Sequence, residues 1–145
     1  MASLHLHQTE QLPIHAPASV PALDPDQFAL LNHIRMAAMG CRAAARVDLF
    51  EACALLTLDG ETARRTFVST FVKCLSDAVN KRIIWHRPGT AELSFDEAWV
   101  MRVFTAIRDE DRASLDFLLR SRVAPADRRY IGFLLNQISD QFCRV

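Results

Sequence analysis

The segment Lys81–Arg87, KRIIWHR, combines the residue types best suited to contact with a ligand. Fixed cations and a histidine surround a tryptophan. Basic residues interleaved with an aromatic ring can hold a phosphate backbone and stack a base. On an extended segment, alternation by two would instead leave Ile84 exposed beside cations, which suits a protein partner or a plainly solvated face. The candidate contact residues of this segment are Arg82, Ile84, Trp85, His86 and Arg87.

A second basic group surrounds the last expected interhelical turn. Arg120 and Arg122 near a helix C-terminus complement the helix dipole, but Arg128 and Arg129 fall in the first turn of the next helix, where that explanation fails. We therefore add Arg128 and Arg129 to the candidate contact surface. The sequence alone does not place this turn beside Lys81–Arg87.

Catalytic motifs are missing from the sequence. It has no Gly-rich phosphate loop, no H-E-x-x-H and no G-x-S-x-G. A Cys74–His86 pair is disfavoured because Cys74 falls in an apolar helical face. The acidic groups at 96–97 and 109–111 stand where helices begin, so capping explains them. We assign no catalytic residue and no cofactor, and we favour a protein that is not an enzyme.

The N-terminal zone holds three of the five histidines and no sustained periodicity. An H-x-H pair with further ligands nearby could bind a transition metal. We favour a flexible polar arm over residues 1–23, because nothing in the segment would hold such ligands rigidly, and assign no metal site. The residues concerned are His5, His7, Glu10 and His15.

Composition describes an ordinary globular chain of 145 residues. Lysine plus arginine balances aspartate plus glutamate at 17 each. The chain therefore has no net charge that would attract nucleic acid or an acidic membrane. Arginine greatly exceeds lysine, as in GC-rich bacterial coding. The four cysteines fit no zinc or redox spacing, and no secretory or membrane-spanning segment is evident. We expect a bacterial, cytoplasmic protein.

Helical periodicity dominates residues 24–145. The central helix is Glu61–Lys81, where two adjacent apolar rows make one broad face. A helix opening at Asp24-Pro25 precedes it, and a short one from Asp48 to about Leu56 lies between them. Three more follow: one from the Ser94/Glu97 capping box to Arg108, one to Arg122 and one from Pro125.

One segment breaks this helical pattern. Residues 82–86 are β-branched and aromatic, and Arg87-Pro88-Gly89-Thr90 is a good type II turn. Residues 91–95 could return alongside, so we expect a short β-hairpin around residues 82–95. The predicted fold is all-α: an orthogonal bundle of five or six helices in a single domain, 24–145, with this hairpin inserted.

The functional hypothesis that follows is a small non-enzymatic protein-interaction or regulatory domain. It would bind a protein partner or itself as a homodimer, with the small residues around Ala37 and Ala38 as a candidate seam. The first alternative is a nucleic-acid-binding accessory protein that uses the Arg/Trp/His patch. The second is a small-ligand sensor or enzyme with an interhelical pocket near His33 or His86.

Overall fold

A computed structural model describes residues 22–40 and 60–143 of the chain. Five α-helices account for most of these residues, and no strand occurs among them. The all-α prediction is therefore confirmed. The expected arm over residues 1–23, its histidines and the helix expected at residues 48–56 lie outside the described residues, apart from positions 22 and 23. No helix in the described part of the chain is long and apolar enough to cross a membrane.

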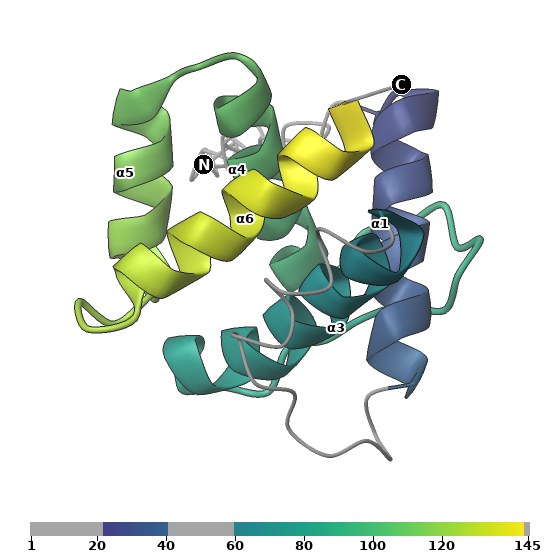
Figure 1. Cartoon of the computed structure of the whole chain (residues 1–145), viewed down its shortest axis with the longest axis horizontal. Coiled ribbons are helices and arrows are strands. Elements are labelled where there is room, and N and C mark those ends of the chain that lie inside the picture. Colours follow the sequence, from purple (N-terminus) through teal and green to yellow (C-terminus); the bar gives the residue numbers. More distant parts are fainter. Residues whose placement is uncertain (1–21, 41–59, 144–145) are drawn as a thin grey trace, which may run out of the picture.

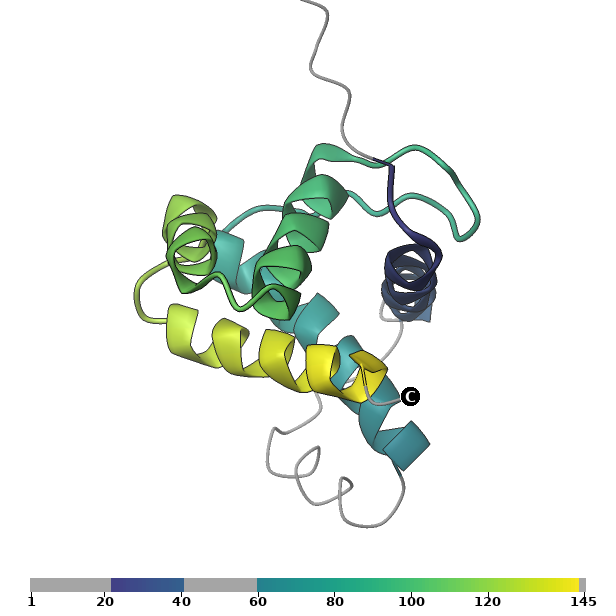
Figure 2. The same ribbon diagram turned by 90° about the horizontal axis from the view of Figure 1, so that it is seen from above.

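Helix α3 (Gly60–Val79) packs against both α1 (Pro25–Gly40) and α6 (Arg128–Cys143). Figure 1 shows α1, α4 (Phe95–Arg108) and α5 (Arg112–Arg122) standing roughly upright, with α3 and α6 running obliquely across them. Figure 2 shows α6 lying over α3. The central role predicted for this helix agrees with the packing, because its two apolar rows contact a helix on each side.

The core is built from the apolar rows that the sequence displays. Phe67, Phe71 and Leu75 of α3 are fully buried, and Phe71 meets Phe104 of α4 edge to face, with ring centroids 6.4 Å apart. From α6, Ile131, Leu134, Leu135 and Ile138 complete the interior. Burial of each such side chain contributes about 1.5–3 kcal/mol.

Capping residues fix the start of three helices, and before α1 the Asp24 carboxylate accepts from the Gln27 amide at 2.8 Å. Ser94 and Glu97 form the predicted capping box of α4: the Ser94 hydroxyl accepts from the Glu97 amide at 3.1 Å, and the Glu97 carboxylate accepts from the Ser94 amide at 3.0 Å. Asp111 caps α5 by accepting from the Ser114 amide at 3.0 Å.

The last helix begins at Arg128, later than the expected start at Pro125. The Asp127 amide donates to the Ala124 carbonyl, which closes a turn before the helix. The Ala124 amide in turn donates to the Ala78 carbonyl at 3.1 Å, which ties this turn to the end of α3. Tertiary contact with α3 therefore holds residues 124–127 outside the helix.

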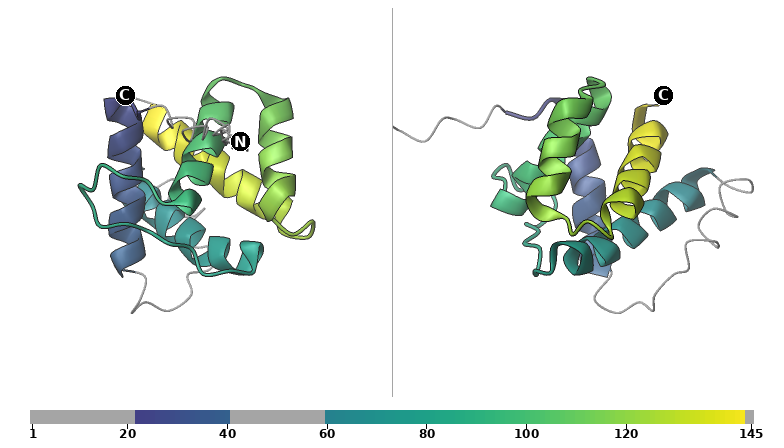
Figure 3. Two further views of the ribbon diagram at one scale, coloured as in Figure 1. Left: turned by 180° about the vertical axis from the view of Figure 1, so that it is seen from behind. Right: turned by 90° about the vertical axis from the view of Figure 1, so that its left-hand side faces the viewer.

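The prediction of a β-hairpin around residues 82–95 is wrong, because no strand forms there. The turn itself forms, with a 3.2 Å hydrogen bond from the Thr90 amide to the Arg87 carbonyl and Gly89 at φ 83°. The two flanking segments do not pair with each other, because side chains of α1 and α4 take their backbone groups instead. The segment runs past α1 and returns to the start of α4, as Figure 3 (left) shows.

Candidate functional site: the groove beside residues 82–87

A fully buried ion pair joins α1 to the start of α4. Arg35 Nε donates to Glu97 Oε1 at 2.8 Å, and Arg35 Nη2 donates to Glu97 Oε2 at 2.9 Å. The same guanidinium donates to the carbonyls of Thr90 and Glu92, at 2.7 and 3.0 Å. A planar bidentate pair of this kind fixes geometry as well as charge, so Arg35 attaches the segment between α3 and α4 to the body of the protein.

The carboxylates at the start of α4 hold the same segment from its other side. Glu97 Oε1 accepts from the His86 amide at 2.7 Å, and Asp96 Oδ2 accepts from the Ile84 amide at 2.8 Å. The Ser94 hydroxyl donates to the Ile84 carbonyl at 2.6 Å. These bonds replace the strand ladder that the sequence predicted, and they leave an irregular segment firmly attached.

Both carboxylates remain charged despite their burial. Burial raises the pKa of Glu97, but hydrogen bonds from Arg35, Ser94 and His86 outweigh it, so the pKa lies below its ordinary value. Burial likewise raises the pKa of Asp96, and the Ile84 amide and Arg122 more than offset that effect. The segment is therefore held by ionised acceptors, whose hydrogen bonds are stronger than neutral ones.

A groove with a volume of about 1020 Å³ lies between α1, α3 and this segment. The six consecutive residues from Arg82 to Arg87 all line it. From α1 come Arg35, Ala38 and Met39, and from α3 come Val72, Lys73 and Ser76. The groove is large enough for part of a peptide or for a small ligand.

The groove combines apolar surface with positive charge. Met39 is 62% exposed and Ile84 is 57% exposed, whereas Trp85 is half-buried and packs against the core. Lys73, Arg82 and Arg87 bring fixed positive charge, and no acidic side chain is among the lining residues of this described site. Arg35 adds no net charge to the groove, because Glu97 neutralises its guanidinium.

Five residues of the predicted contact surface thus lie along one groove: Arg82, Ile84, Trp85, His86 and Arg87. Arg128 and Arg129 do not line it. Arg128 is half-buried, and its Nε donates to the Val123 carbonyl at 2.9 Å, which closes the turn before α6. Arg129 is exposed on α6. The structure therefore does not join the two basic groups in one hollow.

Sequence reasoning missed Arg35 and Met39. Arg35 follows Ile34 and stands four residues after Leu31, so it occupies the apolar face of α1, and a charged residue there signals a buried partner. Met39 gives no comparable signal, because it becomes part of the groove only when residues 82–87 pack beside α1. In the sequence, capping alone explains Glu97, but in the structure Glu97 also forms the ion pair with Arg35.

The histidines and the cysteine considered for chemistry do not assemble. His86 Nδ1 lies 2.9 Å from the Glu92 carbonyl, which can only accept, so this nitrogen carries the proton. Cys74 Sγ lies 3.6 Å from the Tyr130 hydroxyl. His33 is exposed on α1 and meets Phe142 edge to face. The three side chains contact three different parts of the fold.

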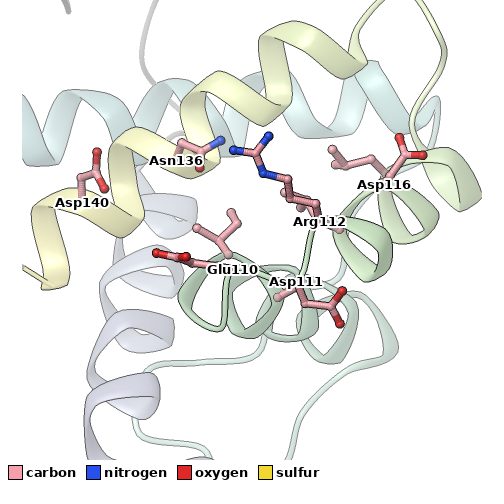
Figure 4. A pocket seen from close by; sticks show the side chains of 10 residues that line it. Glu110, Asp111, Arg112, Asp116, Asn136 and Asp140 are labelled. Carbon is pink, nitrogen blue, oxygen red and sulfur yellow. The ribbon is translucent and has the colours of Figure 1, made fainter.

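A second hollow of about 650 Å³ lies where α4, α5 and α6 meet. Figure 4 shows its acidic side chains spread around the rim without converging on a common point. Asp111 caps α5, and Asp116 pairs with Arg120 at 3.0 Å. No group of three potential metal ligands occurs among the described residues. The groove beside residues 82–87 is therefore the stronger candidate.

Comparison with protein-family models, with curated proteins and with solved structures found no match to this chain.

Proposed function

We propose that this chain is a non-enzymatic protein-interaction domain whose groove beside residues 82–87 receives a segment of another protein. The observation that carries the proposal is the exposure of Met39 and Ile84 at one groove that also holds Trp85. Large apolar side chains gathered at a preformed hollow typify partner surfaces. The proposal includes a cytoplasmic setting, which the cysteine spacing supports.

A nucleic-acid partner is the main alternative, and the positive lining of the groove favours it. Against it, Trp85 is half-buried against the core, which limits the ring face available for stacking a base. The exposed apolar side chains of the groove, Met39 and Ile84, are also aliphatic, a type suited to contact with protein. The overall charge of zero adds no long-range attraction for a phosphate backbone.

Site-specific photocrosslinking tests the proposal. A benzoylphenylalanine placed at Ile84 reports on the groove, and the same residue at Phe117 serves as the matched control. Phe117 is 72% exposed on α5 and does not line the groove. In cells that naturally produce the chain, we expect a discrete protein adduct from position 84 and none from position 117.

Three results would contradict the proposal. One is the absence of an adduct at position 84, and another is an equal adduct pattern at positions 84 and 117. The third is an adduct that nuclease treatment removes, which would support the nucleic-acid alternative instead. An adduct with a second copy of the chain would keep the interaction role and identify the partner as the protein itself.

A further inference from the structure

The backbone of residues 82–87 has one edge bonded to α4 and one edge, called the free edge below, whose amides have no acceptor in the described part of the chain. The amides of Ile84 and His86 both donate to carboxylates of α4. Amides two residues apart that point to the same side are characteristic of an extended strand, in which the intervening amides point to the opposite side. Those intervening amides, at Ile83, Trp85 and Arg87, have no acceptor among the described residues.

We propose that an extended acidic peptide of the partner adds to this free edge as a β-strand. The inference rests on the protein-interaction role and names the mode and the chemistry of the partner. The segment lines the groove along its whole length, and six extended residues span about 20 Å, the length of a typical strand. Main-chain hydrogen bonds would give affinity, and alternate side chains of the peptide would enter the groove.

The edge is held ready for such an addition. Asp96 and Glu97 of α4 hold the segment itself, and Arg35 of α1 holds the chain just beyond the turn, before any partner arrives. A preformed edge avoids much of the cost of ordering a loop on binding. This attachment also explains why a segment with strand-like composition forms no hairpin: its bonded edge is already occupied by α4.

Charge identifies the occupant. Arg82 and Arg87 stand at the two ends of the segment, both exposed, and neither has a side-chain partner in the described part of the chain. The lining of the groove contains no acidic side chain. An acidic peptide complements this positive charge.

The same charges disfavour a second copy of the chain as the occupant. Pairing of two such edges would bring the basic segments of both copies together, and parallel pairing would align identical arginines. Like charges directly opposite each other destabilise a strand pair, and charged residues on an exposed edge are a common protection against self-association. The carboxylates of an acidic partner would instead attract Arg82 and Arg87.

Amide hydrogen exchange gives the most specific test. The probe is a blocked six-residue peptide in which valine alternates with glutamate, added to the full-length protein. In the free protein we expect slow exchange at Ile84 and His86 and fast exchange at Trp85 and Arg87. With saturating peptide, Trp85 and Arg87 should become protected while Ile84 and His86 do not change. Equal protection of all four, or of none, would overturn strand addition.

Backbone methylation of the peptide separates main-chain pairing from side-chain contact. N-methylation at the three valines and N-methylation at the three glutamates each remove donors from one edge of the peptide without changing its charge. Strand addition predicts that one of these two peptides fails to bind and the other binds about as well as the parent. Binding of both, or of neither, would contradict the proposed mode.

Charge variants test the chemistry of the partner. R82E/R87E should weaken binding of the glutamate peptide by about tenfold, or about 1.4 kcal/mol, and should favour a lysine–valine peptide. The matched control is R102E/R112E, which reverses two exposed arginines away from the groove and should bind the glutamate peptide like the unmodified protein. Equal binding of the glutamate and lysine peptides to the unmodified protein would overturn the acidic assignment.

Failure of this inference can be told apart from failure of the interaction role. If the peptides do not bind but position 84 still crosslinks to a protein, only strand addition by an acidic segment is wrong. If position 84 yields no protein adduct, the interaction role itself is wrong. Tight binding of a single-stranded oligonucleotide, in place of the peptide, would overturn both.

Discussion

Arg35 and Glu97, 62 residues apart in the sequence, form a bidentate ion pair from which solvent is completely excluded. The pair does more than neutralise two charges, because each partner also binds backbone groups of the segment between α3 and α4, whose first part, residues 82–87, lines the groove. Arg35 reaches two carbonyls beyond the turn, and Glu97 reaches the amide of His86 before it. Stability of the fold and the shape of the candidate site therefore depend on the same two side chains.

The first prediction concerns loss of the cation. Arg35→Met leaves a buried carboxylate without its partner and two carbonyls without a donor, so we expect the free energy of unfolding to fall by about 3–5 kcal/mol. The control is Arg65→Met, which removes an exposed pair with Glu61 and should cost less than about 0.5 kcal/mol. Urea unfolding measures both values.

A double variant tests whether the unpaired Glu97 carboxylate causes the loss of stability in Arg35→Met. If the unpaired charge of Glu97 accounts for the loss, then R35M/E97Q should be more stable than R35M alone, although less stable than the unmodified protein. A double variant less stable than R35M would show that the capping and backbone bonds of Glu97 outweigh its unpaired charge.

The second prediction is a loss of stability in acid. Glu97 and Asp96 both have pKa values below their ordinary range in the folded protein. Such groups contribute stability that is fully present above the unfolded-state pKa and is lost as pH falls through the folded-state pKa. We therefore expect the free energy of unfolding to decline below about pH 4.5.

Urea unfolding at pH 7, 5, 4 and 3 measures this decline. Glu97→Gln should be less stable than the unmodified protein at pH 7 but should lose less on acidification, because one of the two responsible carboxyls is gone. Asp116→Asn, which removes an exposed carboxyl of α5, should keep the full decline. Parallel curves for all three proteins would show that the buried carboxylates are not responsible.

The helices could be predicted from the sequence because their signals are local. Apolar rows at three- and four-residue spacing identify α3, and the Ser94/Glu97 box marks the first residue of α4. The hairpin prediction was wrong for the opposite reason. Strand-like composition at residues 82–86 does not reveal that Arg35 will take the carbonyls of Thr90 and Glu92, which the second strand of a hairpin would need for pairing.

The candidate site was predictable only in part, for the same physical reason. A basic and aromatic run is visible in the sequence, so Arg82 and Trp85 could be named in advance. The opposite wall of the groove comes from Met39 of α1 and Lys73 of α3, and no local pattern places these beside residues 82–87. Arg128 looked equivalent to Arg82 in sequence, yet its guanidinium closes a turn.

The third prediction tests the double role of Ser94. Its hydroxyl accepts from the Glu97 amide and donates to the Ile84 carbonyl, so Ser94→Ala removes a helix cap and also leaves a carbonyl without its donor. We expect a loss of about 1–2 kcal/mol. Ser121→Ala, which removes an exposed bond to the Leu118 carbonyl, should change stability by less than about 0.5 kcal/mol. Similar losses in the two variants would argue against the double role.

The fourth prediction compares two glycines for which the same substitution should have opposite effects. Gly89 adopts φ 83° in the turn beside the groove, and an added Cβ would meet no atom within 4 Å. The left-handed backbone alone penalises a side chain there, so Gly89→Ala should destabilise the protein by about 1–2 kcal/mol. Gly132 lies inside α6, where an added Cβ would make ordinary contact with Leu119 Cδ1 at 3.8 Å.

At Gly132 the helical backbone suits alanine, and the substitution restricts the unfolded chain. Gly132→Ala should therefore stabilise the protein by about 0.5–1 kcal/mol. Thermal and urea unfolding of the two variants, made singly and together, should give effects that add, because the two positions lie in separate elements. Stabilisation by Gly89→Ala would mean that the turn does not hold a left-handed residue.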